Sequence, residues 1–115
     1  MVATLTALEA AALIASSRVD VIDVRDYDEF DAGHLPAARA VPLDLLRADT
    51  DAELRGTKAG VLFVCARGVR SLSAAKMAER LGYENVFSLE GGTSAWAAAG
   101  LPIATGKAAD QRRAA

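Results

Sequence analysis

Residues 61–81 contain an apolar segment, a cysteine, a short loop and a helical segment, in that order. The segment Val61-Leu62-Phe63-Val64 is apolar and rich in residues that favour strands, which predicts a fully buried strand. Residues 71–81 have the pattern of a helix. A buried strand followed by a helix is the repeating unit of an α/β fold with a parallel sheet, so this segment points to that fold class.

Cys65 is the only cysteine of the chain and directly follows the predicted strand. Between the carboxyl end of a strand and the amino end of a helix, a thiol meets unpaired backbone N–H groups and the positive end of a helix dipole. These groups lower its pKa from a free value of about 8.5. A lone cysteine is commonly a small buried hydrophobe. Packing does not explain Arg67, Gly68 and Arg70 beside it, so Cys65 is a candidate nucleophile.

A ring of N–H groups around a thiolate serves two chemistries. In one, the thiolate attacks a phosphate or arsenate that is bound in a loop of cysteine, five residues and arginine. In the other, the thiolate takes a sulfur atom from a donor and stores it as a persulfide. Four residues separate Cys65 from Arg70, so this loop is one residue shorter than the phosphatase spacing. A smaller ring fits one terminal sulfur better than a tetrahedral oxyanion.

The rest of the chain alternates predicted strands and helices, as expected for one domain of 115 residues. Further strands are predicted at residues 2–5, 19–23, 40–42 and 86–89, and Pro42 places the third of them at a sheet edge or strand end. Helices are predicted at 7–15 with a capping box of Thr6 and Glu9, and at 26–31, 43–48 and 93–99. Residues 49–60 are predicted to be a loop with one helical turn, and Phe87 and Trp96 to be core residues.

The segment Cys65-Ala66-Arg67-Gly68-Val69-Arg70-Ser71 resembles the active-site loop of rhodanese-like sulfurtransferases. The resemblance extends from about Leu5 to Pro102, with the motifs in the family's order. Leu35 and Ala37 depart from the commonest family residues, and Ala66 replaces a charged residue that some members carry. The further matching residues are Val21-Ile22-Asp23-Val24-Arg25, then Tyr27, Glu29 and Phe30, then Gly33-His34-Leu35-Pro36-Ala37-Ala38, and finally Gly91-Gly92, Trp96 and Gly100-Leu101-Pro102.

The resemblance implies a rhodanese-like domain over residues 1–104, with a parallel sheet of about five strands and helices on both faces. We expect residues 105–115 to be a flexible tail. The implied activity is transfer of a sulfane sulfur from a small anionic donor such as thiosulfate to a thiol, cyanide or protein acceptor. The sulfur passes through a persulfide on the catalytic Cys65, without a metal or organic cofactor. The implied substrate-binding residues are Ala66, Arg67, Gly68, Val69, Arg70 and Ser71.

The sequence allows two interpretations for some of the side chains near the loop. Asp23 is expected to support the loop by accepting from its N–H groups, or else to cap the next helix. Arg25 is expected to support the loop or to be a surface arginine, and we favour the second for Arg25. Arg67 is expected to point outward toward the donor, whereas Arg70 is expected to pair with an acidic residue and fix the loop. His34 is expected to fix a turn and not to act as a general base.

Two alternatives to the enzyme remain open at this point. One is a non-catalytic rhodanese-like interaction or regulatory module, and the other is a relative of phosphatases or arsenate reductases. A formal charge of −2 gives no indication of binding to nucleic acid or to an anionic membrane. A single cysteine excludes an internal disulfide, and with no apolar run of membrane-spanning length and no signal segment, we expect a cytoplasmic protein.

Overall fold

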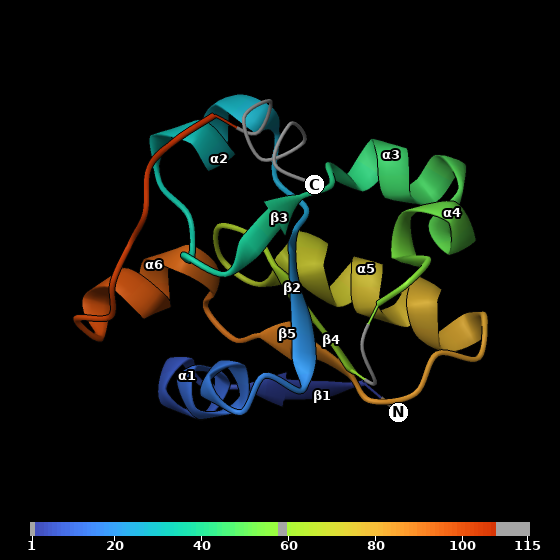
Figure 1. Cartoon of the computed structure of the whole chain (residues 1–115), viewed down its shortest axis with the longest axis horizontal. Helices are drawn as coiled ribbons and strands as arrows, with labels where there is room; N and C mark the ends of the chain where they lie inside the picture. The colour runs from blue at the N-terminus through green and yellow to red at the C-terminus, as the bar shows by residue number, and fades with distance from the viewer. Residues whose placement is uncertain (1, 58–59, 108–115) are drawn as a thin grey trace.

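The computed structural model describes residues 2–57 and 60–107, and within them the chain forms a five-stranded parallel sheet (Figure 1). The strand order is β1-β5-β4-β2-β3, and every neighbouring pair is parallel. The predicted α/β class is therefore confirmed. The strands are β1 Ala3–Leu5, β2 Val19–Asp23, β3 Ala38–Ala40, β4 Gly60–Val64 and β5 Val86–Leu89.

Helices cover both faces of the sheet and form two apolar clusters with it, as predicted. On one face, α1, α2 and α6 contribute side chains such as Ala10, Phe30 and Trp96. On the other face, α3, α4 and α5 contribute side chains such as Leu46 and Leu54. The helices are α1 Ala7–Ala15, α2 Tyr27–Ala32, α3 Leu43–Ala48, α4 Thr50–Leu54, α5 Val69–Arg80 and α6 Gly92–Ala98.

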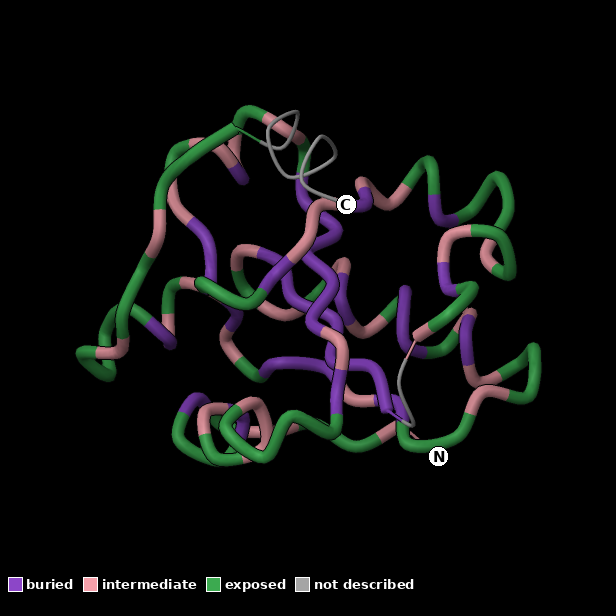
Figure 2. Tube along the Cα trace, in the orientation of Figure 1, coloured by how far each residue is buried: buried purple, intermediate pink, exposed green. Residues whose placement is uncertain are grey.

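The central strand β4 supplies side chains to both clusters, and the whole strand is buried (Figure 2). Leu62 and Val64 pack in the cluster beneath α1 and α6, whereas Val61 and Phe63 pack in the cluster beneath α5. Burying each such side chain contributes about 1.5–3 kcal/mol, so the register of β4 is strongly fixed. The same alternation directs Cys65, the next odd-numbered residue, toward the α5 side of the sheet.

Element boundaries differ from the predictions where proline and glycine act. The third strand is β3 Ala38–Ala40, paired with β2, so its prediction at 40–42 is wrong in position. Pro42 has no N–H to extend the ladder, and it precedes α3 as the N-cap. The predicted edge position of this strand is confirmed. Helix α5 begins at Val69, earlier than predicted, because Gly68 takes the N-cap position with a φ of 99°.

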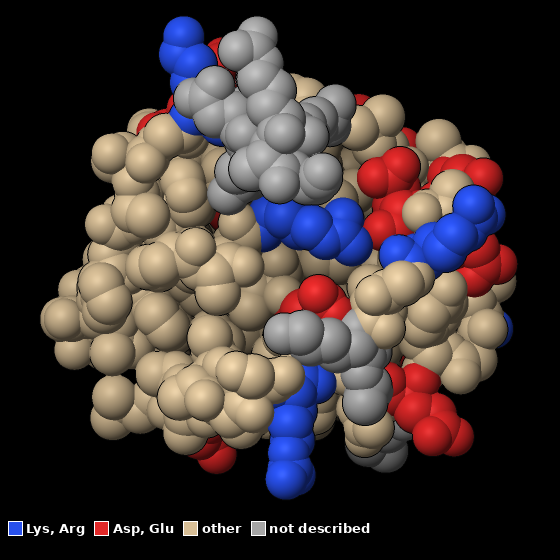
Figure 3. Space-filling view, viewed as in Figure 1, with Lys and Arg blue, Asp and Glu red and all other residues tan. Residues whose placement is uncertain are grey.

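The capping box predicted at the start of α1 is confirmed. Thr6 Oγ1 accepts a hydrogen bond from Glu9 N at 3.2 Å, and Glu9 Oε1 accepts from Thr6 N at 2.9 Å. Helices α1 and α6 are otherwise nearly uncharged, and Figure 3 shows few charged side chains over them and many more over α3 and α4. On the face that Figure 3 shows, charged side chains are therefore sparse over α1 and α6.

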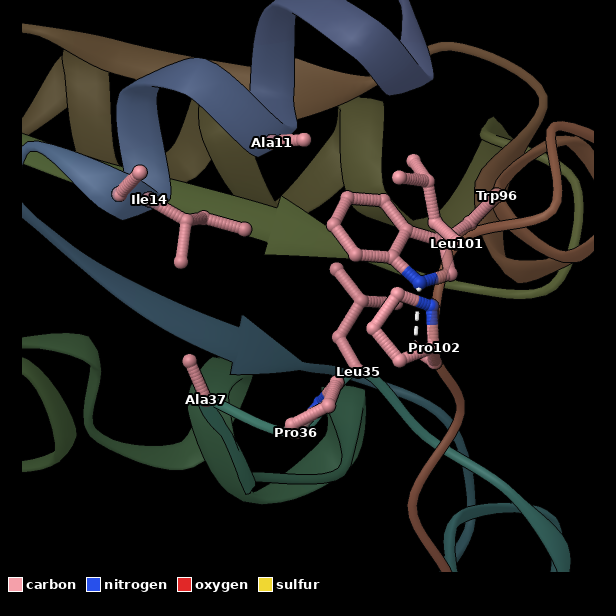
Figure 4. Close-up of a pocket in the computed structure, with 9 residues that line it drawn as sticks. Ala11, Ile14, Leu35, Pro36, Ala37, Trp96, Leu101 and Pro102 are labelled. Carbon is pink, nitrogen blue, oxygen red and sulfur yellow. Dashed lines mark hydrogen bonds between the residues drawn. The ribbon is translucent and has the colours of Figure 1, made fainter.

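The cluster beneath α1 and α6 opens into an apolar groove of about 250 Å³ (Figure 4). Trp96 lies in this groove, and its indole Nε1 donates to the carbonyl oxygen of Pro102 at 2.8 Å. Trp96 is buried, as predicted, and Phe87 is half-buried against the same cluster. The groove carries no nucleophilic or charged side chain, since alanine, isoleucine, leucine, proline and tryptophan line it.

Residues 105–115 were predicted to be a flexible tail. Residues 105–107 are exposed and form neither helix nor strand, while the remainder of that segment lies outside the described residues. The extent of the tail stays a prediction. In the described part of the chain, every helix is too short or too polar to cross a membrane.

Candidate active site

Cys65 lies at the carboxyl end of β4 and is 1 % exposed, but its sulfur has polar surroundings. Its Sγ accepts hydrogen bonds from the backbone N–H of Gly68 at 3.1 Å and of Ser71 at 3.3 Å. The Ser71 hydroxyl lies 3.4 Å from the same atom. The amides of Gly68 and Ser71 therefore face the sulfur, so burial here does not mean an apolar environment.

The N-terminus of α5 accounts for one of these donors. Ser71 is the third residue of α5, and the first N–H groups of a helix have no partner within it. The Ser71 N–H is free for the sulfur because the chain turns sharply at Gly68, whose φ of 99° suits a residue without a side chain. A Cβ there would also lie 3.2 Å from Gly91 N and 3.3 Å from Leu89 O.

The N-terminus of α6 holds the outer side of the loop. Thr93 N donates to the carbonyl oxygen of Cys65 at 2.9 Å, and Ser94 N donates to the carbonyl oxygen of Ala66 at 3.2 Å. These bonds fix both carbonyl groups toward α6, so the N–H groups that follow are left to face the sulfur. Gly92 packs directly against this part of the loop. Sequence reasoning did not identify this second helix terminus as part of the site.

Burial and hydrogen bonding act in opposite directions on the Cys65 thiol. Burial raises its pKa, whereas the hydrogen bonds that favour the thiolate lower it. The hydrogen bonds outweigh burial, so the pKa of Cys65 lies below the ordinary thiol value. The donors are the Ser71 hydroxyl and the backbone N–H groups of Ser71, Arg67 and Gly68.

Arg70 forms a two-point ion pair with Glu29 of α2. Its Nη1 lies 2.9 Å from Oε1, and its Nη2 lies 3.0 Å from Oε2. The hydrogen bond from Arg70 lowers the pKa of Glu29 against the opposing effect of burial. The expected pairing of Arg70 with an acidic residue is confirmed. Arg67 is exposed and, among the described residues, has no acidic partner within ion-pair distance.

Asp23 and Arg25 form a buried ion pair with each other, and this corrects both readings of Asp23. Arg25 Nη2 lies 2.7 Å from Asp23 Oδ2, and Arg25 N and Nε also donate to Asp23. Among the described residues, the Asp23 carboxylate therefore accepts from Arg25 and not from N–H groups of the loop, and the N-cap of the next helix is Asp26. Arg25 is 6 % exposed, so its assignment as a surface residue is wrong. It also donates to the carbonyl oxygen of Gly33 at 2.7 Å.

His34 is buried and is held by contacts with Phe30 and with Ala104. Its ring stacks on Phe30 with the centroids 3.8 Å apart, and Nδ1 lies 2.8 Å from the Phe30 carbonyl oxygen. Because a carbonyl oxygen only accepts, Nδ1 carries the hydrogen. The backbone of His34 also pairs with Ala104 in an antiparallel bridge. These contacts agree with the expected structural role of His34.

Ser88 is a site residue that the sequence did not single out. It is buried in β5, and its Oγ lies 2.8 Å from the Oγ of Ser71. A serine within the apolar strand Val86–Leu89 was the one available signal, because a buried hydroxyl requires a partner. Cys65, Ser71 and Ser88 thus form a continuous chain of polar contacts beneath α5.

The comparisons with known proteins agree with this geometry. Residues 6–99 match the family model described as the rhodanese-like domain. The chain belongs to the rhodanese-like family. This confirms the resemblance that was drawn from the loop and the accompanying motifs.

Relatives of this rhodanese-like domain differ in what is known of them. The uncharacterized protein YqhL of Bacillus subtilis is 35% identical over 69% of this chain, but the match spans only 61% of YqhL itself. The thiosulfate sulfurtransferase GlpE of Tolumonas auensis is 34% identical over 76% of this chain and 81% of GlpE. A solved structure from Rhodopseudomonas palustris, described as of unknown function and a possible tyrosine phosphatase, has a TM-score of 0.79 and 34% identity, covering 90% of this chain and 85% of that one.

Of the predicted loop residues, Arg67, Gly68 and Ser71 direct hydrogen-bond donors at the sulfur, while the Arg70 side chain pairs with Glu29 and Val69 is exposed. Among the described residues, no group of three or more His, Cys, Asp or Glu side chains could hold a metal ion. The arrangement offers a low-pKa thiol, a set of amide donors and one exposed cation. The catalytic role of Cys65 and the binding roles of the loop residues stay predictions at this point.

Proposed function

We propose that this rhodanese-like domain is a sulfurtransferase that carries a sulfane sulfur as a persulfide on Cys65. The observation that supports this most is the pair of amide N–H groups, from Gly68 and Ser71, that converge on Sγ. Such donors stabilise a sulfur anion, both on the free cysteine and on a persulfide. The similarity to the thiosulfate sulfurtransferase GlpE supports thiosulfate as the donor.

The reaction consists of two displacements at sulfur. The Cys65 thiolate attacks the outer sulfur of thiosulfate, a new S–S bond forms, and sulfite leaves with the electron pair of the broken S–S bond. In the second step, the lone pair of a thiol, cyanide or protein acceptor attacks the terminal sulfur. The bond to Cys65 breaks, and its electron pair restores the thiolate. Because Cys65 is almost fully buried, this route favours a small donor.

The remaining predicted site residues have supporting roles in this proposal. Ala66, Gly68, Val69 and Ser71 contribute the backbone of the ring, and Arg70 holds the ring to α2 through Glu29. In this proposal Asp23 and Arg25 support the site from the end of β2, where Asp23 pairs with Val64, the residue before Cys65, and their ion pair holds this strand end. We propose that residues 1–104 are the working domain and that it acts in the cytoplasm, where a reducing environment preserves a free thiol.

A phosphatase is one rival to this proposal, since a structural neighbour carries that description. An arginine that closes a phosphate loop donates to the equatorial oxygens of the phosphate. In this chain both outer nitrogens of Arg70 already donate to Glu29. The Arg70–Glu29 pair and the short loop together favour sulfur over phosphate.

Incubation of the reduced protein with thiosulfate tests the proposal. We expect the intact mass to rise by one sulfur atom and to return to its original value after cyanide is added. A phosphatase would show no adduct and would release nitrophenol from an aryl phosphate. A non-catalytic module would show neither. An unmodified mass with a free, reduced Cys65 would therefore contradict the sulfurtransferase.

The exposed charge of Arg67 gives a prediction about the donor. Replacing Arg67 by alanine is expected to raise the KM for thiosulfate about three- to tenfold and to weaken its dependence on salt, because an unpaired cation at the loop attracts an anionic donor. Steady-state rates at two ionic strengths measure both effects.

Arg80→Ala is the charge-matched control for this substitution. Arg80 ends α5, and the 11 steps of about 1.5 Å from Val69 to Arg80 place it about 16.5 Å along the helix from the loop, beyond the screening length of about 8 Å. The control removes the same charge and is expected to leave the KM unchanged. Equal KM values for the two variants would place Arg67 outside the donor site.

A further inference from the structure

Two buried hydroxyl groups continue from the sulfur into the sheet. Ser71 is 0 % exposed and Ser88 is 1 % exposed, and their Oγ atoms lie 2.8 Å apart. Ser88 reaches Ser71 because alternate residues of β5 face α5, as Val86, two positions earlier, does. Ser88 does not touch the sulfur, so any effect on Cys65 passes through Ser71.

The direction of one hydrogen atom decides what Ser71 offers to the sulfur. A hydroxyl has a single hydrogen to donate and two lone pairs. If the Ser71 hydrogen points to Ser88, then Cys65 Sγ faces a lone pair, which opposes negative charge on the sulfur. If Ser88 donates to Ser71, the Ser71 hydrogen is released to point toward Sγ, 3.4 Å away.

The surroundings of Ser88 allow its hydroxyl to donate to Ser71 Oγ. Ser88 lines a pocket of about 350 Å³, together with polar groups such as Thr4 and Lys76. Ser88 itself is 1 % exposed, and among the described residues the side-chain partner of its Oγ is Ser71 Oγ, so the Ser88 hydrogen has an acceptor there.

We propose that Ser88 is a positioning residue for the Cys65 chemistry, because its hydroxyl donates to Ser71 Oγ and turns the Ser71 hydrogen toward the sulfur. This inference rests on the proposed function only in assigning that chemistry. In this proposal the donors run from Ser88 to Ser71 to Cys65 whenever the sulfur is ionised. The same order of donors would stabilise the cysteine thiolate that leaves when the persulfide gives up its sulfur.

Alkylation of Cys65 by iodoacetamide, followed across pH, tests this role without a sulfur donor. The thiolate is the reacting form, so the rate rises as pH passes the pKa. Ser88→Ala removes a hydrogen bond that favours the thiolate of Cys65, so the pKa of Cys65 rises. The pH at which the alkylation rate is half-maximal, the alkylation midpoint, is expected to move up by about 0.5 to 1 pH unit. Ser88→Thr keeps a hydroxyl and is expected to restore the midpoint.

Ser73→Ala is the control, since Ser73 is an exposed serine on the same helix as Ser71. Its midpoint is expected to match that of the unaltered protein. The charged groups near the loop are identical in all these variants and cannot cause a difference. They are Arg67 and Arg70 on the loop and α5, the Asp23–Arg25 pair on β2, Glu29 on α2, Lys76 on α5 and Glu90 after β5.

A double variant separates a positioning role from a general loss of packing. In a Ser71→Ala background, Ser88→Ala is expected to cause no further shift, because its route to the sulfur is already lost. An unchanged midpoint in Ser88→Ala alone, or a full additional shift in the double variant, would overturn the proposal. Failure of persulfide formation would instead contradict the sulfurtransferase and leave the alkylation result intact.

Discussion

Replacing Cys65 by serine is expected to abolish the sulfur adduct and to lower the rate of thiocyanate formation by at least about a thousandfold. A serine hydroxyl is not ionised near neutral pH, and it cannot form the S–S bond that stores the transferred sulfur. Intact mass after incubation with thiosulfate measures the adduct. Thiocyanate formed from thiosulfate and cyanide measures turnover.

Serine is the informative replacement because its oxygen can accept the hydrogen bonds that the loop N–H groups donate to Cys65. The N–H groups of Gly68 and Ser71 donate to the atom at the Sγ position, and a serine oxygen can accept in its place. Cys65→Ala would leave both buried donors without an acceptor, which costs about 1–3 kcal/mol for each group. The serine variant is therefore expected to unfold at nearly the same temperature as the unaltered protein. Thiocyanate formation that survives in this folded variant would contradict the proposed nucleophile.

The strand, loop and helix around Cys65 follow from local sequence. Four apolar residues define β4, and Gly68 has the conformational freedom that the turn into α5 requires. Because the loop is short, its amides have few directions available, and facing the sulfur is one consequence. Residues that are close in sequence therefore account for most of the candidate site.

The sequence did not predict which residues pair with the arginines of the site. The charge of Arg70 predicts an acidic partner, but the chain has 15 acidic residues, and only the packing of α2 selects Glu29, 41 positions away. Arg25 was assigned to the surface because arginine is rarely buried. Its carboxylate partner Asp23 stands two residues earlier, and the sequence does not reveal that both side chains turn inward.

The contact between the loop and α6 illustrates the same limit, because the Gly91-Gly92 motif matched the family while its physical purpose was not apparent. Those glycines allow the N-terminus of α6 to approach the carbonyl groups of Cys65 and Ala66. The positive φ values of both, 71° and 59°, account for the turn that brings the helix there. Only the three-dimensional structure shows that a side chain at Gly92 would not fit against the loop.

Gly92→Ala is accordingly expected to destabilise the protein by about 3 kcal/mol or more. A Cβ at this position would overlap the carbonyl oxygen of Cys65 and the carbonyl group of Ala66, which are backbone atoms that no rotamer change can move. Either α6 or the loop must shift. Loss of the bonds from Thr93 and Ser94 would free the loop carbonyls to turn, so the alkylation midpoint of Cys65 is also expected to rise.

Gly100→Ala separates steric overlap from backbone strain. Gly100 follows the same helix with a φ of 77°, yet a Cβ there would meet no atom within 4 Å. Gly100→Ala is expected to lower the free energy of unfolding by about 1 kcal/mol, because only the left-handed conformation is strained. The alkylation midpoint of Cys65 is expected to match that of the unaltered protein. Thermal or denaturant unfolding compares the two variants. If Gly92→Ala were no less stable than Gly100→Ala, the close approach of α6 would not be what holds the loop around the sulfur.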